Sequence, residues 1–215
     1  MTTASSPAYV PELREVGEAV DERVRQLQAG YLRDHPDAVS TLARLRRGAG
    51  KTIDEVPELV GVTIDHRFYE TFHVNDPRTP DAESAAHEAL TLYALHQQSK
   101  RDKGMHRRGR DFGGAVRRLM PSGDIDEPLR KRFVQAQTAS SRGTRLDRLR
   151  GIVQLLRAED LPLDYGLLAD QLHDTRTAAG AERVRRAWGR GFQAYRPSRS
   201  EPAPEGDETG THPAE

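Results

Sequence analysis

Residues 79–98, TPDAESAAHEALTLYALHQQ, decide the class of the fold. The triplet Thr79-Pro80-Asp81 has the form of a helix start, with proline at the first helical position and an acidic residue in the first turn. Alanine and leucine then recur at helical spacing as far as Gln98, and the small side chains favour close packing against a neighbour. The stretch therefore predicts a tightly packed helix.

The same periodicity continues on both sides of this helix. Apolar residues at helical spacing predict further helices over Val10–Leu27, Val39–Leu45, Phe112–Leu119, Leu129–Ala136, Leu146–Leu156, Leu163–Leu172 and Val184–Tyr195. We expect Gly30 and Gly48 to end the first two, and Thr144 with Asp147 to form a capping box at the start of the fifth. Strand signals are nearly absent. The sequence therefore predicts an all-α fold.

The helices fall into two groups, which lie before and after a polar, basic stretch. We expect two small helical bundles packed side by side. Residues 10–110 would form an N-terminal helical domain that ends in a basic loop, and residues 111–196 a C-terminal helical bundle. Residues 197–215 are acidic and have no apolar pattern, so we expect a disordered tail there.

Composition excludes several classes of protein. The chain of 215 residues has no cysteine, which excludes disulfides, thiolate catalysis and cysteine-based zinc sites. No apolar run approaches the roughly 20 residues of a membrane helix, and the N-terminus does not resemble a signal peptide. We therefore expect a soluble cytoplasmic protein that makes no contact with a membrane.

The residues offer no recognisable catalytic constellation. His87-Glu88 begins like the HExxH zinc motif but lacks the second histidine, and the eight histidines are interpreted as ordinary, partly exposed residues. Residues 109–114, GRDFGG, match no phosphate-binding loop, and Asp160 and Asp164 have no evident acid–base partner and are expected near a helix N-terminus. We expect no catalytic residues, no cofactor and no metal site.

Clusters of basic residues are the remaining signal, although the net charge of the chain is zero. The first cluster follows the second predicted helix and comprises Arg44, Arg46, Arg47 and Lys51. The second is the loop at residues 100–110 with two arginines behind it, and comprises Lys100, Arg101, Lys103, Arg107, Arg108, Arg110, Arg117 and Arg118. The third comprises Arg142, Arg145, Arg148 and Arg150.

Two interpretations of these clusters stay open. A run of charges is often a solvated face with internal salt bridges, and the first cluster fits this as well as it fits nucleic acid. In the second and third clusters few acids lie nearby in sequence, which favours binding to phosphate. Arg142, Arg145 and Arg148 have the spacing of one helical stripe beside the apolar face, so we expect their replacement to leave folding intact. Aromatic residues do not interleave the clusters, so backbone contact without base stacking is expected.

Two segments resemble the CasB family, the small subunit of type I-E CRISPR Cascade surveillance complexes. TLARLRRGAGKTIDEVPELV (residues 41–60) resembles its N-terminal signature, in which Arg46 and Arg47 are the paired arginines. Residues 109–172 resemble its C-terminal half, with the arginine-bearing leucine helix followed by Asp164-Tyr165, and the last helix with Trp188 also fits. The resemblance covers roughly residues 10–195 and is carried by the order and spacing of the patterns.

This resemblance implies a non-catalytic subunit that functions in antiviral defence. Two copies would lie head to tail in the complex and contact its backbone and large subunits. They would stabilise the R-loop, with crRNA and target DNA as partners and the displaced non-target strand in a basic groove. Two alternatives remain, a free-standing helical DNA-binding protein outside a CRISPR complex and an uncharacterised helical enzyme. The sequence shows no reading helix for the former and no acid–base or metal constellation for the latter.

Overall fold

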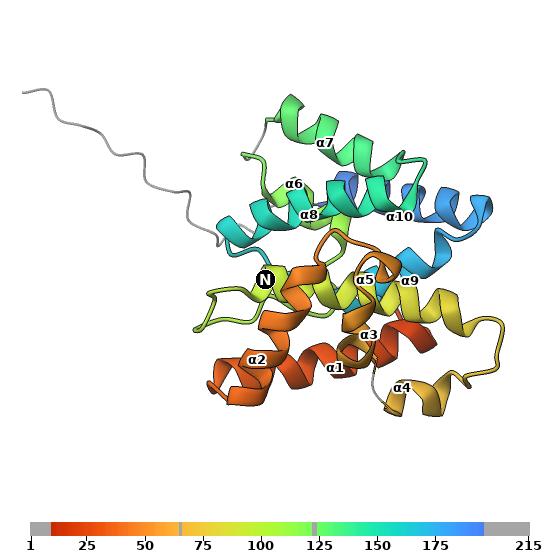
Figure 1. Cartoon of the computed structure of the whole chain (residues 1–215). Coiled ribbons are helices and arrows are strands. Elements are labelled where there is room, and N and C mark those ends of the chain that lie inside the picture. Colours follow the sequence, from red (N-terminus) through yellow and green to blue (C-terminus); the bar gives the residue numbers. More distant parts are fainter. Residues whose placement is uncertain (1–9, 65, 122–123, 196–215) are drawn as a thin grey trace, which may run out of the picture.

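All secondary structure longer than an isolated bridge in the described part of the chain is helical. The computed structural model describes residues 10–64, 66–121 and 124–195, which contain ten α-helices and three short 3-10 helices (Figure 1). The β-type pairing among these residues is an isolated bridge between His106 and Leu163. None of the described helices is long and apolar enough to cross a membrane. The prediction of an all-α fold is confirmed.

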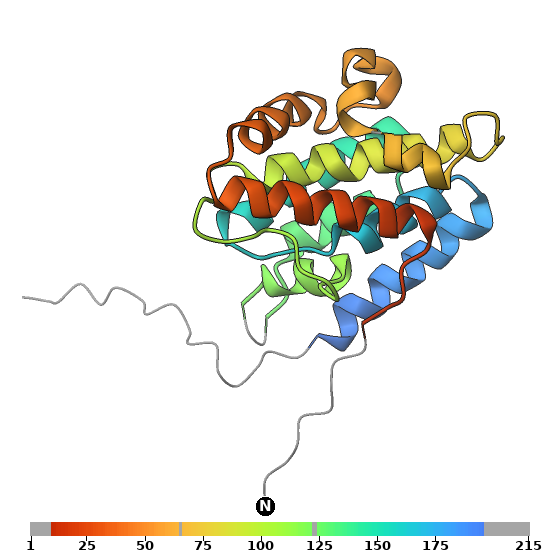
Figure 2. The same ribbon diagram turned by 90° about the horizontal axis from the view of Figure 1, so that it is seen from below.

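Helix α5 (Thr79–Gln97) lies at the centre of the molecule, and Pro80 occupies its first turn as predicted. Its buried residues are spread around the whole helix, as expected for an element covered on all sides. Helices α1 (Glu15–Leu32) and α9 (Tyr165–Asp174) pack against it, and Figure 2 shows α1 running beside it. Glycines let α1 and α9 approach closely, because a Cβ on Gly17 would lie 2.8 Å from the carbonyl oxygen of Gly166.

Short helices connect α1 to α5. They are α2 (Pro36–Leu45), η1 (Arg46–Gly48), η2 (Ile53–Glu55), η3 (Pro57–Leu59), α3 (Val60–Thr63) and α4 (His66–Thr71). Of these, α2, η1, η2 and α3 contact α5 directly. The periodicity does not predict α4, because Phe68 is its single buried residue. This region places the end of α2 and η1 on the surface of α5.

A second group of helices comprises α6 (Phe112–Arg118), α7 (Glu127–Gln137), α8 (Arg142–Ala158) and α10 (Ala178–Ala194). A Cβ on Gly113 of α6 would lie 1.9 Å from the carbonyl oxygen of Trp188, so the two helix backbones touch. The Phe112 ring packs on the Trp188 ring with the centroids 4.6 Å apart. Helix α8 packs against both α7 and α5 and thereby joins the second group to the central helix.

Helix α9 crosses the boundary between the two predicted bundles. It belongs to the second half of the sequence but packs against α1 and α5 of the first half. Buried apolar residues from both halves form one continuous cluster. The two groups of helices therefore share a core. The division into domains at residues 110 and 111 stays a prediction, and the predicted tail at 197–215 lies outside the described residues.

Several helix boundaries differ from the prediction, among them the start of α1, which is Glu15 and not Val10. The cap of α8 is Ser141, whose Oγ accepts a hydrogen bond from the Thr144 N–H at 3.1 Å, so the predicted capping box is wrong. Helix α10 begins at Ala178 behind the cap Thr177, because alanine and glycine give no visible periodicity before the apolar run. Helix α1 continues past Gly30 to Leu32.

Candidate nucleic-acid interface

The basic loop between α5 and α6 carries cations that pair with carboxylates from distant parts of the chain. Lys100 and Lys103 both contact Asp160 after α8, with 2.8 Å between Lys103 Nζ and Asp160 Oδ2. Arg101 pairs with Asp34, which follows α1. For these three cations the structure shows the alternative of internal salt bridges and not the free cations that the sequence favoured. The acids are distant in sequence, and the fold brings them together.

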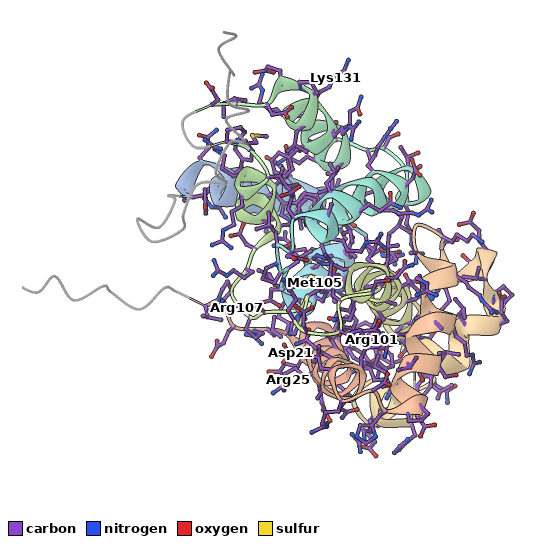
Figure 3. The ribbon with its side chains drawn as sticks, turned by 90° about the vertical axis from the view of Figure 1, so that its left-hand side faces the viewer. Asp21, Arg25, Arg101, Met105, Arg107 and Lys131 are labelled. Atoms are coloured by element: carbon purple, nitrogen blue, oxygen red, sulfur yellow. The ribbon has the colours of Figure 1, made fainter. Side chains whose placement is uncertain are left out.

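Arg108 and Arg107 of the same loop have opposite environments. The Nε of Arg108 lies 3.4 Å from Oδ2 of Asp164, the cap of α9, and its Nη1 lies 3.9 Å from Oδ1 of the buried Asp21. Arg107 is exposed and has no side-chain partner among the described residues, and Figure 3 shows it at the outer side of the loop. Arg107 is therefore a loop cation that is open to an external phosphate.

Two glutamines fix the shape of this loop. The Gln97 amide donates to the carbonyl oxygens of Lys100 and Lys103 at 2.6 and 2.9 Å, and its oxygen accepts from the Met105 N–H at 2.9 Å. The Gln28 oxygen accepts from the His106 N–H at 2.8 Å, and its amide donates to the His106 carbonyl at 3.3 Å. Met105 and His106 are buried. The loop is therefore polar and basic in sequence but buried at its centre.

Asp21, His106 and Asp164 form a buried group whose ligand atoms lie within 4.8 Å of one another, a spacing that suits a metal ion. His106 Nδ1 accepts from the Tyr165 N–H at 3.1 Å, so Nε2 carries the proton and donates to Asp21 Oδ1 at 2.9 Å. Asp164 accepts from two backbone N–H groups. Burial lowers the pKa of His106. Because hydrogen bonds and the Arg108 guanidinium already occupy these atoms, the group fits a structural role.

Two arginines of the third cluster face inward. Arg142 pairs with Glu88, which is buried in the middle of α5, and Arg176 lies 3.6 Å from the same carboxylate. Arg145 donates to Thr175 Oγ1 at 3.1 Å. Burial raises the pKa of Glu88 and lowers that of Arg145. These contacts tie α8 to its neighbours, so we now expect replacement of Arg142 or Arg145 to destabilise the fold, contrary to the expectation from the sequence.

The other two arginines of the third cluster, Arg148 and Arg150, are exposed on the outer side of α8. Together with Arg132 of α7 they line a shallow pocket of 290 Å³, in which Asp147 is the one carboxylate among the lining residues. None of the three arginines has an ion-pair partner among the described residues. This part of α8 therefore presents positive charge to solvent.

The first cluster lies at the end of α2 and in the segment after it, and meets the third cluster. Gly50 has a left-handed backbone with φ +86°, and a Cβ there would lie 2.7 Å from Cδ of Arg150. Figure 1 shows this segment, in orange, reaching α8. None of the cluster's cations has an ion-pair partner within the described ranges. They are Arg44, Arg46, Arg47 and Lys51.

The contact at Gly50 brings the segment after α2 against Arg150 of α8. We group the cations on either side of this contact and the lining arginine of α7 under the name arginine face. It comprises Arg46, Arg47, Lys51, Arg132, Arg148 and Arg150. Sequence reasoning missed Arg132 because the third cluster was defined on the α8 sequence alone. The sequence did hold a signal for Arg132, because the excess of basic residues that continues into α8 already begins at Arg130 in α7.

Two of the remaining cations of the second cluster, Arg110 and Arg118, lie beside the end of α10. The Arg118 guanidinium lies over the Tyr195 ring, 5.0 Å from its centroid, and Arg110 lines the same small pocket as these two residues. Arg117 Nη1 donates to the Pro121 carbonyl at 3.2 Å. Arg110 and Arg118 are therefore grouped apart from the paired cations of the loop.

Comparison with known proteins agrees with this arrangement of helices. Residues 41–192 match the family described as CRISPR-associated protein Cse2. The chain belongs to the Cse2 family. The solved structure of CasB from Thermobifida fusca is similar, with 58% sequence identity and a TM-score of 0.77 over 84% of this chain and 99% of that chain. The family resemblance inferred from the sequence is thereby confirmed.

A second solved structure shares the fold at lower identity. It is a chain of a CRISPR RNA-guided surveillance complex, with a TM-score of 0.56 and 19% identity over 84% of this chain and 95% of that chain. No curated protein matches the chain. At this identity the second structure supports the fold alone.

Proposed function

We propose that this chain is the non-catalytic small subunit of a type I-E Cascade complex and binds the sugar-phosphate backbone of the displaced DNA strand through the arginine face. The proposal is carried by the contact between Gly50 and Arg150, which unites cations from two distant segments. Guanidinium groups suit phosphate because they donate two parallel hydrogen bonds. Cations without internal partners are also those that gain most from a polyanion.

The proposal includes the partners expected for such a subunit. They are the backbone and large subunits of Cascade, a second copy of this chain, the crRNA and the target DNA, in the cytoplasm. Specificity would come from guide pairing, and this subunit would stabilise the open R-loop. The arginine face carries no aromatic residue, which favours contact with phosphates over reading of sequence.

The double variant Arg148→Ala/Arg150→Ala tests this proposal. Both side chains are exposed and unpaired, so the midpoint of thermal unfolding should stay within about 2 °C. Binding of single-stranded DNA at low salt should weaken roughly ten-fold. The slope of log K against log salt should become shallower by about 1 to 2.

A matched control removes two positive charges elsewhere. Arg185 and Arg190 are exposed on α10, which packs against α6 and α9. Their double alanine variant should bind DNA nearly as well as the wild type. Equal losses in the two double variants would show that net charge alone matters and would contradict a specific face. The role of the face in Cascade is tested by placing the same two double variants in the assembled complex and measuring the lifetime of the R-loop.

A further inference from the structure

A pocket of 380 Å³ opens between α2 and α5, and Arg46 of the arginine face is one of its lining residues. Its walls are apolar and come from Val39, Leu42 and Ala43 of α2 and Ala94 of α5. Its polar lining comes from the end of α5, the residues that follow it and two cations. These are Gln97, Gln98, Ser99, Arg46 and Arg101, with Tyr31 completing the lining. The pocket thus combines a mixed polar and apolar lining with positive charge from the edge of a proposed phosphate-binding surface.

Arg101 forms a stacking platform at this pocket. Its guanidinium lies over the Tyr31 ring, 4.9 Å from the ring centroid, and pairs with Asp34. The Tyr31 hydroxyl accepts a hydrogen bond from the Ser99 N–H at 3.2 Å, which fixes the ring. Figure 3 shows Arg101 on the side of the molecule where the loop passes over α1. With 53% of its side chain exposed, Arg101 stays accessible from solvent while it contacts the ring and Asp34.

The two residues that hold this platform have a left-handed backbone. Asp34 and Ser99 have φ angles of 57° and 65°, and each follows the C-cap of a helix, α1 or α5. A left-handed residue commonly ends a helix at this position, and Asp160 after α8 does the same. These helix ends place Asp34 against the Arg101 guanidinium and the Ser99 N–H against the Tyr31 hydroxyl.

We propose that this pocket receives one nucleobase of a single strand that crosses the arginine face. The inference deepens the proposed function and rests on it. A nucleobase has flat apolar faces and a polar edge, and arginine planes stack on bases as aromatic rings do. The base would lie on Arg101 between the apolar walls, and Arg46 would hold an adjoining phosphate. Gln98, whose oxygen accepts from Arg157 Nη1 at 2.9 Å, has an amide N–H for the base edge.

The size of the pocket agrees with this occupant. Ligand pockets measure about 300–1,000 Å³, so 380 Å³ places this one at the small end of that range. The contribution of stacking to the binding free energy would be independent of strand charge, because stacking depends on the base and not on the phosphate. Sequence analysis had no signal for this stack, since Tyr31 and Arg101 are far apart in the chain.

The test compares two oligonucleotides of equal length and charge, oligothymidylate and the same backbone with every base removed. Binding of both to the full-length protein is measured at low salt. Arg101→Lys keeps the positive charge and removes the stacking plane, and Ala43→Phe fills the pocket without a change of charge. Each variant should bind oligothymidylate about five-fold or more weakly than the wild type, in line with the stacking contribution of one base. Each should bind the abasic strand as the wild type does.

Arg150→Lys is the matched control, because it makes the same chemical change on the open arginine face. It should alter the binding of both strands by the same small factor. Equal binding of the two strands by the wild type, or equal losses for both strands in Arg101→Lys, would overturn the nucleobase pocket while leaving the arginine face intact. If the wild type binds neither strand, the proposed function and the pocket both fail.

Discussion

Glu88 shows how one buried residue can change the role of a charged cluster. Its carboxylate is 3% exposed and receives Arg142 from α8 and Arg176 from the turn after α9. A buried charge is tolerated when it is paired, and loss of one partner leaves an uncompensated charge in a medium of low dielectric constant. Arg142 has no other carboxylate partner among the described residues, whereas Arg176 also pairs with Asp81 at 3.2 Å.

Replacement of Glu88 by glutamine should lower the free energy of unfolding by about 3–5 kcal/mol, because the two guanidinium groups lose their shared counterion. Denaturant unfolding followed by circular dichroism measures this loss. Glu159→Gln is the control, since it removes the same charge at an exposed position on the surface. Equal stability of the two variants would show that the pair at Glu88 contributes nothing net.

The sequence predicted which arginines share a helical stripe, but not which of them face inward. The spacing of Arg142, Arg145 and Arg148 is correct for one side of α8. Their environments differ because Glu88 and Thr175 approach one end of that stripe from other helices. Periodicity within a helix carries no information about carboxylates on its neighbours. Arg148 remains a candidate for DNA binding, whereas Arg142 has a structural contact.

The basic loop is an element whose shape is imposed by side chains from helices. Gln97 satisfies three backbone groups of the loop and Gln28 satisfies two more. Buried backbone groups must find partners, and these two amides supply them where no helix or sheet does. The loop therefore holds Arg101 and Arg107 in defined positions.

Gln97→Ala should loosen the loop without unfolding the helices. Each lost hydrogen bond contributes about 1 kcal/mol, so amide hydrogen exchange at Met105 should accelerate by ten-fold or more. Exchange in the middle of α5 should stay unchanged. Gln154→Ala, at an exposed position on α8, provides the comparison. Unaltered protection at Met105 would mean that other contacts hold the loop.

The sequence predicted the helices better than it predicted the residues of the site. The helical class and the start of α5 followed from apolar spacing and from proline in the first turn. The position of α9 between α1 and α5 could not be predicted, because its apolar face fits either group of helices. The union of two basic clusters at Gly50 was equally invisible, since it depends on tertiary contact.

The molecule as a whole buries more titratable groups than the sequence suggested. His87 and His96 on α5 are fully buried, so their interpretation as ordinary, partly exposed residues is wrong. Burial lowers the pKa of His87 to about 4 and that of His96 to about 3. The unfolded chain binds protons on these side chains below about pH 6.5, whereas the folded protein does not. The contribution of these two histidines to stability is therefore fully present above pH 6.5 and is lost as the pH falls toward their folded pKa values.

The free energy of unfolding should drop between pH 7 and pH 5 by about 2 kcal/mol for each of these histidines. Urea titrations at several pH values measure the drop. His87→Gln should show a smaller pH dependence than the wild type over this interval, whatever its stability at pH 7, because His96 and His106, whose pKa burial also lowers, keep their contributions. Parallel curves for the two proteins would assign the dependence to other groups.

The meeting of Gly50 with Arg150 has a practical consequence for dissection of this subunit. Peptides or fragments taken from either side of the chain display only part of the charge pattern, so an array of short segments would under-report its affinity for polyanions. On heating, DNA binding by the intact protein should instead be lost in the same cooperative transition as the tertiary structure.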